Sequence, residues 1–306
     1  MTFLLLSIVC SVSVAHLLKY AEGKTLPTFG LLAVNYLVAS LVAFVGGSSE
    51  LFSLRDSQGE TRLSLDAFWA NSSHLLHRFS APLILLGMVV GVLFVCNYLL
   101  MILTIKRLGV TIPVSLMRLS AVLPTFGSIV FFAERPNIFQ LAGIFLAFLS
   151  LPLASEERIA FSNLVQIMEN GFGWGLLLFL IFGVANFIFK IQRELFPLEN
   201  PDHFLILIFL TAFLVSASVA VWQKTPITRT VVSFGTVLGI LNLFASYFLM
   251  KALQTLPGIV VYPTNGIGII VLSAITSLLL WQERLKRSNY GFIALAATAL
   301  LLIYPR

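Results

Sequence analysis

The sequence predicts an all-α polytopic membrane protein whose ten transmembrane helices form two inverted five-helix repeats. Three observations predict this fold. Hydrophobic residues make up 58% of the 306 residues and charged residues only 10%, whereas a soluble domain carries roughly 25% charged residues. The mean hydropathy is +0.98. Apolar runs of membrane-spanning length alternate with short polar breaks, and the second half of the chain resembles the first.

The composition also excludes several classes of protein. A water-soluble globular protein would need more charge to cover its surface, and a disordered chain would need lower hydrophobicity. The net charge of +6 is spread over successive loops, so the basic residues are interpreted as topology signals and not as a nucleic-acid site. Cys10 and Cys96 both lie inside apolar runs, which predicts two core thiols, no disulfide and no metal site. We expect no cofactor.

Each span is placed by an apolar run of about 20 residues between polar breaks. The first run, up to Tyr20, lacks the positive start of a signal peptide, so we expect it to be retained as a span. The ten expected spans are residues 2–20, 27–46, 81–105, 110–133, 137–154, 172–190, 202–222, 231–251, 257–281 and 289–304. The long loop 47–80 leaves two alternatives open for residues 63–79, an interfacial helix or a surface loop with apolar anchors.

The two halves align at an offset of 149 residues, which places segment 97–135 over segment 246–284. Gly109 then matches Gly258, and the pair Glu134-Arg135 matches Glu283-Arg284. The sequence therefore predicts two repeats, residues 1–154 (with the long loop 47–80) and residues 172–306. Because five spans is an odd number, the second repeat must enter the membrane from the opposite face. The basic residues divide almost evenly between the two sides, so they do not fix the orientation.

These repeated features resemble a known family. Ile105-Lys-Arg-Leu-Gly109 leads into a span with Pro113 and Pro124, and Lys251-Ala-Leu-Gln-Thr-Leu-Pro-Gly258 leads into a span with Tyr262-Pro263. Both copies resemble the EamA-type repeat of the drug/metabolite transporter superfamily. The resemblance implies ten helices in a plasma (inner) membrane, both termini in the cytoplasm, and a central cavity lined mainly by spans 1, 3, 4, 6, 8 and 9. One departure is Asn35-Tyr36, where many relatives carry an arginine.

Polar residues within spans are the candidates for a binding site, because charge at mid-bilayer is costly. Every acidic residue lies in a loop or at a span end, which argues against a proton relay through a buried carboxylate. The intramembrane cation is Arg118, which shares one helical face with Ser115, Thr125 and Ser128. Two interpretations carry equal weight. Arg118 either holds an anion through its planar guanidinium or extends from shallow depth to the lipid headgroups.

Further polar residues lie in the middle of other spans. We expect them to line a hydrogen-bonding cavity, although helix packing explains each asparagine at least as well. His16 is a candidate proton-coupling group or, more often for such a residue, a hydrogen-bonded core histidine. Pro113, Pro124 and Pro263 interrupt spans 4 and 9, and such interruptions often mark a transporter's binding site. The candidate substrate-binding residues are Arg118, Asn35, Asn97, Tyr98, Asn186, Asn242, Tyr262, Asn265 and His16.

The sequence thus predicts a secondary transporter that moves a small anionic or zwitterionic metabolite, such as an amino acid or organic acid, by alternating access. The alternatives are an exporter of drug-like or neutral solutes such as sugars or nucleosides, and a non-transport scaffold or lipid-sensing subunit. An enzyme is not expected, because no nucleophile or metal set lies at membrane depth. The expected partners are a small-molecule solute and the lipid bilayer, with the protein as a monomer or homodimer.

Overall fold

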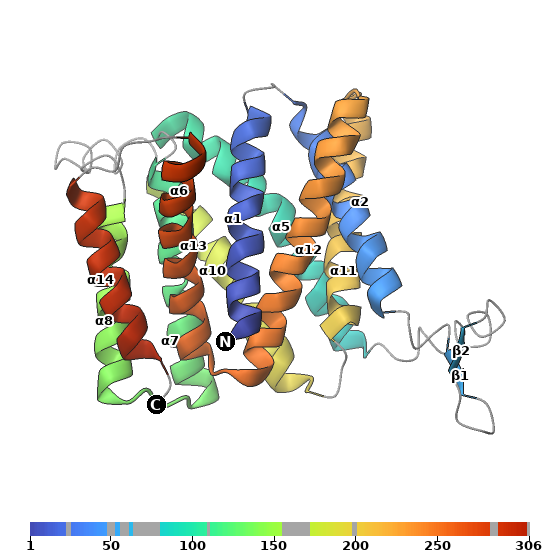
Figure 1. Ribbon diagram of the computed structural model, residues 1–306. Helices are drawn as coiled ribbons and strands as arrows, with labels where there is room; N and C mark the ends of the chain where they lie inside the picture. The colour runs from blue at the N-terminus through green and yellow to red at the C-terminus, as the bar shows by residue number, and fades with distance from the viewer. Residues whose placement is uncertain are drawn as a thin grey trace.

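The computed structural model describes residues 1–22, 26–47, 53–55, 61–63, 80–108, 111–154, 172–197, 201–281 and 287–304. These residues form a bundle of α-helices with a small two-stranded hairpin outside it (Figure 1). The elements are α1 (Thr2–Glu22), α2 (Thr28–Gly47), β1 (Ser53–Arg55), β2 (Thr61–Leu63), α5 (Ala81–Leu108), α6 (Thr111–Leu119), α7 (Val122–Phe132), α8 (Ile138–Ala154), α10 (Phe172–Leu195), α11 (Pro201–Trp222), α12 (Arg229–Thr255), α13 (Gly258–Trp281) and α14 (Arg287–Ile303).

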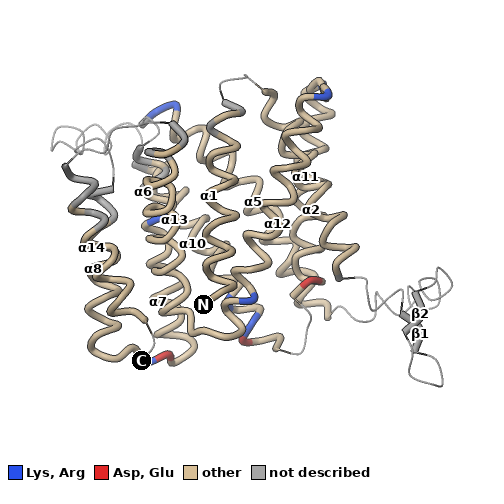
Figure 2. Tube along the Cα trace, in the orientation of Figure 1, with Lys and Arg blue, Asp and Glu red and all other residues tan. Residues whose placement is uncertain are grey.

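The bundle has the character of a membrane-embedded helical protein. Six of the described helices are long and apolar enough to cross a bilayer, and four shorter apolar stretches accompany them. Large apolar side chains also point outward, as Phe131 and Phe145 do on α7 and α8 with 73% and 67% exposure. Such side chains would be unfavourable in water and are suited to lipid. Charged positions lie mostly at the two ends of the bundle, with one basic position halfway along the α6–α7 region (Figure 2).

The helices pack in matched pairs. Helix α2 packs on α11 at one edge of the bundle, and α8 packs on α14 at the other edge (Figure 1). Between the edges, α1 contacts α12 and α13, while α10 contacts α5 and the α6–α7 pair. Helix α12 also packs on α2, as α5 packs on α11. If α1, α2, α5, α6–α7 and α8 are matched in order with α10, α11, α12, α13 and α14, each contact named in this paragraph has a counterpart.

Small residues permit the closest of these contacts. A Cβ atom on Gly87 would lie 2.6 Å from Leu207, and one on Gly91 would lie 2.6 Å from the carbonyl oxygen of Ile208. The Gly87-x-x-x-Gly91 pattern therefore packs α5 directly on the backbone of α11, as expected for helices in lipid. Gly239 does the same for α12, where its Cβ position meets the carbonyl oxygen of Asn35 on α2.

The fourth expected span, residues 110–133, is divided. Helix α6 ends at Leu119, Ser120 and Ala121 form a turn, and α7 begins at Val122. Within this turn the backbone N–H of Ala121 donates to Arg118 at 3.2 Å and that of Leu123 donates to Ser120 at 2.9 Å, both over three residues. Pro124 contributes to this break, because it has no N–H to donate to Ser120 and is favoured in the first turn of a helix. Pro263, which was also expected to interrupt its span, lies inside the continuous helix α13.

The other span boundaries lie close to the expected ones, and α1 begins at the same end of the bundle at which α14 finishes (Figure 1). The long loop differs from expectation, because Ser53–Arg55 and Thr61–Leu63 pair as antiparallel strands. Residues 64–79, which contain nearly all of the expected interfacial helix or surface loop, lie outside the described residues.

Candidate solute-binding site

A central cavity lies beside the break between α6 and α7. Residues from three segments surround it: Met117, Arg118 and Ala121 at the break, Phe182 and Asn186 on α10, and Tyr262, Asn265 and Gly266 on α13. These side chains leave room for little more than one water molecule at a time. The structure therefore shows a constricted cavity, with four of the nine sequence-predicted site residues around it.

Arg118 supplies the positive charge of this cavity. It is the basic residue in the last turn of α6 and lies seven residues after Thr111, or about 10 Å along the helix. Its side chain is half-buried, and among the described residues no carboxylate forms an ion pair with it. A guanidinium without a counterion at this depth is costly in an apolar surrounding and attracts an anion. The helix C-terminus beside it offsets part of its charge.

Three polar side chains from α10 and α13 lie around the same space. The Tyr262 hydroxyl donates to the carbonyl oxygen of Asn186 at 3.0 Å, and the Asn186 side-chain amide donates to the carbonyl oxygen of Phe182 at 2.8 Å. The side-chain oxygen Oδ1 of Asn265 is buried and has no hydrogen-bond partner. Because a buried unpaired acceptor is unfavourable, Asn265 offers a place for a donor group of a bound solute.

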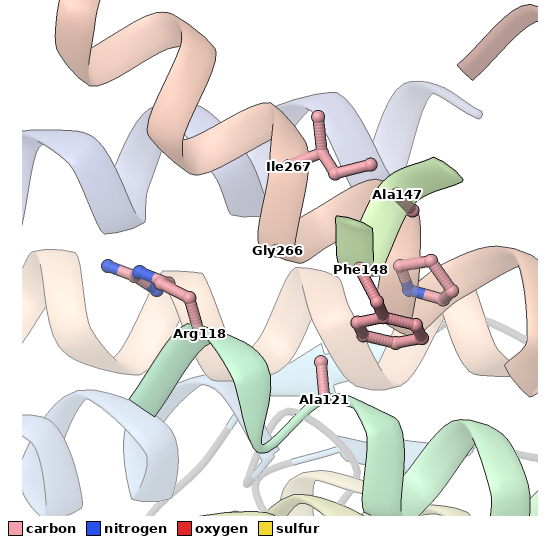
Figure 3. A pocket seen from close by; sticks show the side chains of 7 residues that line it. Arg118, Ala121, Ala147, Phe148, Gly266 and Ile267 are labelled. Atoms are coloured by element: carbon pink, nitrogen blue, oxygen red, sulfur yellow. The ribbon is translucent and has the colours of Figure 1, made fainter. Parts of the chain in front are cut away.

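A second, apolar cavity adjoins the first and shares Arg118, Ala121 and Gly266 with it. Its other walls are Ala147 and Phe148 on α8 with Pro263 and Ile267 on α13, and these side chains leave no room for a water molecule. Figure 3 shows the Arg118 side chain extending away from Phe148 and Ala147. The two cavities together therefore present a cation between a polar wall and an apolar wall.

Five of the sequence-predicted residues lie outside both cavities. Asn35 is 2% exposed at the α2–α12 contact and Asn97 on α5 is 8% exposed, each with its Oδ1 buried and unpartnered. Tyr98 packs partly buried against the main hydrophobic core, and Asn242 is half-buried on α12. The Nε2 atom of His16 lies 2.6 Å from the Thr276 hydroxyl, which ties α1 to α13. Their part in binding stays a prediction.

The helices around the cavities also differ from the set implied by the family resemblance. Helix α8 contributes two residues, while α1, α5 and α12 contribute none to either cavity. Helices α1 and α12 instead pack on each other, with the Ser7 hydroxyl donating to the carbonyl oxygen of Ala245 at 2.8 Å. The polar strip expected on span 4 is also divided by the helix break, because Thr125 and Ser128 are buried and donate to carbonyl oxygens of their own segment.

A charged cluster that sequence analysis missed lies one helical turn along α10 and α13 from residues that line the central cavity. Glu134, just after α7, accepts hydrogen bonds from the backbone N–H groups of Gly258 and Ile259 at 2.8 and 2.9 Å. Its Oε1 also lies 2.6 Å from the Lys190 ammonium, whose side chain is 4% exposed. Glu134 therefore caps the N-terminus of a helix. The helix is α13, from the other half of the chain.

Glu134 lies at a span end, as expected for every carboxylate, but its contacts are inside the helix bundle. Its side chain is only 11% exposed, although its position in the sequence is a span end. The signal that could have found it is Lys190, because a lysine within an apolar span needs an anionic partner. Glu134 and Lys190 are 56 residues apart, so only the packing of α7 against α10 shows that they meet.

Comparisons with known proteins support the fold but give no activity. No family model matches the chain. An uncharacterized protein of Haemophilus influenzae is 26% identical over 310 aligned residues, which cover 98% of this chain and 97% of that protein. A solved crystal structure superposes with a TM-score of 0.75 at 13% identity and covers 99% of this chain and 96% of its own. The chain therefore shares its whole fold with an experimentally determined protein structure.

Proposed function

We propose that this protein is a secondary transporter that carries a small anionic or zwitterionic metabolite through the central cavity by alternating access. The observation that carries the proposal is Arg118, a half-buried guanidinium with no carboxylate partner among the described residues, which lines that cavity at a helix break. Broken helices near the middle of a membrane are a common way to build a transport site. The sequence resemblance to EamA-type transporters agrees with this function.

The polar wall narrows the class of solute. Arg118 offers two parallel donors to a carboxylate, and the unpartnered Asn265 Oδ1 offers an acceptor. A solute that carries both a carboxylate and a donor such as an ammonium or hydroxyl group would satisfy both residues. Amino-acid-like and hydroxy-acid-like solutes fit this description. The apolar wall beside Phe148 would contact an apolar part of such a solute once the surrounding helices move apart.

The proposal includes a membrane topology. Counting α6 and α7 as one span, the described helices suit ten spans in two inverted five-helix repeats, and the matched helix contacts support this arrangement. Both termini would then face the cytoplasm from a plasma (inner) membrane. In this arrangement the working unit is a monomer or a homodimer, and the two halves rock against each other around Arg118.

Two other functions remain to be tested against this one. The first is export of a neutral or drug-like solute, which the apolar cavity beside Phe148 favours over the polar wall. The second is a scaffold or lipid-sensing subunit, which the small size of the cavities favours. The two are distinguished by whether any soluble metabolite stabilises the protein.

The test is a thermal-shift screen of the purified protein against anionic, zwitterionic, cationic and neutral metabolites. A ligand at 100 times its Kd adds about 2.7 kcal/mol to the stability of the folded protein. We expect a stabilising ligand among the carboxylates. Arg118→Ala should then weaken its binding roughly 10- to 150-fold, the equivalent of about 1.5–3 kcal/mol for a hydrogen bond to a charged group. Arg118→Lys should weaken it less, because lysine keeps the charge but loses the planar fork.

Arg229→Ala is the matched control, because Arg229 is exposed at the first position of α12 and its loss changes the net charge equally. This variant should bind as the unchanged protein does. Stabilisation by cations only would contradict the proposal. So would equal affinity in the Arg118 variants and the control, which would leave Arg118 as a residue that extends to the headgroups.

A further inference from the structure

The cluster around Glu134 holds together three helices that must separate if the central cavity is to open at that end. Glu134 follows α7, Lys190 belongs to α10, and Gly258 and Ile259 begin α13. Helices α10 and α13 also line the cavity, and α7 follows directly after Ala121, which lines it too. Charged positions of both signs lie at this end of the bundle (Figure 2). The contacts therefore close one end of the proposed transport path.

The cluster lies one helical turn from the cavity. Tyr262 lies four residues after Gly258 on α13, and Asn186 lies four residues before Lys190 on α10. Their hydrogen bond at 3.0 Å joins the same two helices as the charged cluster. A solute that moves Tyr262 or Asn186 thus acts on the helices that the cluster connects. Ser128 approaches Gly258 so closely that a Cβ atom there would overlap its hydroxyl, so α7 and α13 are also in direct contact.

Lys190 has a second carboxylate within reach. Its ammonium lies 2.7 Å from Glu194 Oε1, one turn farther along α10, as well as 2.6 Å from Glu134. The Glu194 side chain is 38% exposed and belongs to the same helix as Lys190. If α10 separated from the end of α7 and the start of α13, Lys190 would lose Glu134 but keep Glu194. A buried lysine left with no anion is strongly unfavourable, and Glu194 prevents that outcome during opening.

From this geometry we infer that Glu134 and Lys190 form the closing contact at this end of the cavity, and that opening leaves Lys190 paired with Glu194 alone. The inference rests on the proposed transport function. The closed state is held by an ion pair, two charge-assisted hydrogen bonds to the start of α13 and the Tyr262 bond. The open state keeps the lysine neutralised through Glu194. The two glutamates therefore have opposite effects, since Glu134 favours closure and Glu194 favours opening.

The test measures access to the cavity without any solute. A reporter cysteine replaces Ala121, which lines both cavities, in a background with Cys10→Ser and Cys96→Ser. A membrane-impermeant maleimide is added from either side of sealed vesicles. A separate Pro197→Cys variant, exposed just after α10, shows which side corresponds to the Glu134 end. The measured quantity is the labelling rate of the Ala121→Cys reporter from that side.

Glu134→Gln and Glu194→Gln are chemically identical changes and serve as each other's control. We expect Glu134→Gln to raise the labelling rate roughly tenfold, because it removes an ion pair and weakens two charge-assisted hydrogen bonds. We expect Glu194→Gln to lower the rate at least threefold. Tyr262→Phe removes only the bond to Asn186 and should also raise the rate, which keeps the test valid if Glu134→Gln does not fold.

Unchanged labelling in Glu134→Gln and Tyr262→Phe would overturn the closing contact. A rate that rises or stays equal in Glu194→Gln would overturn the second role of Lys190. Because labelling requires no solute, these outcomes are independent of the Arg118 binding test. If the closing contact fails its test but carboxylates still bind, the transport proposal stands. If carboxylates do not bind but the two glutamate variants have opposite effects, only the assigned solute is wrong.

Discussion

At the scale of single residues, two glycines of α13 have different roles. Gly266 leaves space at the cavities, and Gly258 permits close contact with α7. A Cβ atom on Gly266 would lie 3.8 Å from the Ala121 side chain, an ordinary contact distance, and would project into the space beside Arg118. A Cβ atom on Gly258 would instead overlap the Ser128 hydroxyl. The same substitution should therefore change binding at one position and stability at the other.

Gly266→Ala should place a methyl group in the shared part of both cavities, where little more than a water molecule fits, and reduce carboxylate binding at least tenfold. We expect little loss of stability, because helix α13 gains a better helix former. The measurement is a ligand titration followed by thermal shift. Gly173→Ala is the matched control, since no other group of the described residues lies within 4 Å of the Cβ position of Gly173. Equal binding in both variants would show that the solute does not occupy this space.

Gly258→Ala should destabilise the folded protein by roughly 1–3 kcal/mol, as overpacking of a tight contact generally does. Adding Ser128→Ala to it removes the hydroxyl that the new methyl group meets, and should restore part of the loss. Chemical denaturation in detergent measures both variants. An additive result in the double variant would mean that Gly258 and Ser128 do not share this contact.

At the scale of elements, the break between α6 and α7 sets the position of Arg118. A continuous helix would place Arg118, Thr125 and Ser128 along one face, as the sequence analysis expected. The turn at Ser120 and Ala121 instead leaves Arg118 at the cavity, while Thr125 and Ser128 are buried in α7. Pro124 keeps this turn open because it cannot donate a hydrogen bond to Ser120.

Pro124→Ala should restore an N–H at this position and favour one continuous helix. We expect the variant to be at least as stable as the unchanged protein and to bind carboxylates more weakly, because Arg118 would rotate away from the cavity. Thermal shift with and without ligand separates the two effects. Pro136→Ala, just after Glu134 and outside any helix, is the control. Undiminished binding in Pro124→Ala would show that the break does not position Arg118.

Helices were more predictable from the sequence than the site. Apolar length and polar breaks suffice to place helices in a bilayer, and the expected boundaries of α2, α8 and α11 lie within about two residues of those observed. Neither the hairpin Ser53–Leu63 nor the burial of Glu134 was predicted. Burial of Glu134 depends on α10 and α13, which lie far away in the sequence. A local pattern carries no information about such partners.

The asparagines also show that the sequence predicts residue types better than their positions in the site. Asn186 and Asn265 line the central cavity, whereas Asn35 and Asn97 are buried in helix contacts with an unpaired oxygen each. All four were equally central in their spans. The neighbouring helix decides which face of a span meets the cavity. Gly239 of α12 packs against the backbone of Asn35, so this part of α2 lies in a helix contact. The sequence alone therefore identified suitable residue types but could not separate cavity from packing.

At the scale of the whole molecule, the matched contacts divide the bundle into parts that meet around the cavity. The edge pairs α2–α11 and α8–α14 each combine corresponding helices of the two halves. Under the proposed repeat, the α1–α12 contact corresponds to α5–α10, and the α2–α12 contact corresponds to α5–α11. Alternating access in inverted repeats uses this property, because the two halves can exchange conformations to reverse the open side.

This arrangement predicts where the connections lie relative to the membrane. With ten spans, the hairpin of β1 and β2 follows the second span and should lie on the side of the N-terminus, while the turn between α11 and α12 follows the seventh and should lie on the opposite side. Cysteines at Ser53 and Gln223, in the background without Cys10 and Cys96, test this with an impermeant maleimide added to sealed vesicles. We expect Ser53→Cys and a cysteine at Thr2 to react from one side and Gln223→Cys from the other.

Labelling of Ser53→Cys and Gln223→Cys from the same side would mean that the number of spans between them is even. The two halves would then have parallel rather than inverted topology, and rocking around Arg118 would need a different symmetry.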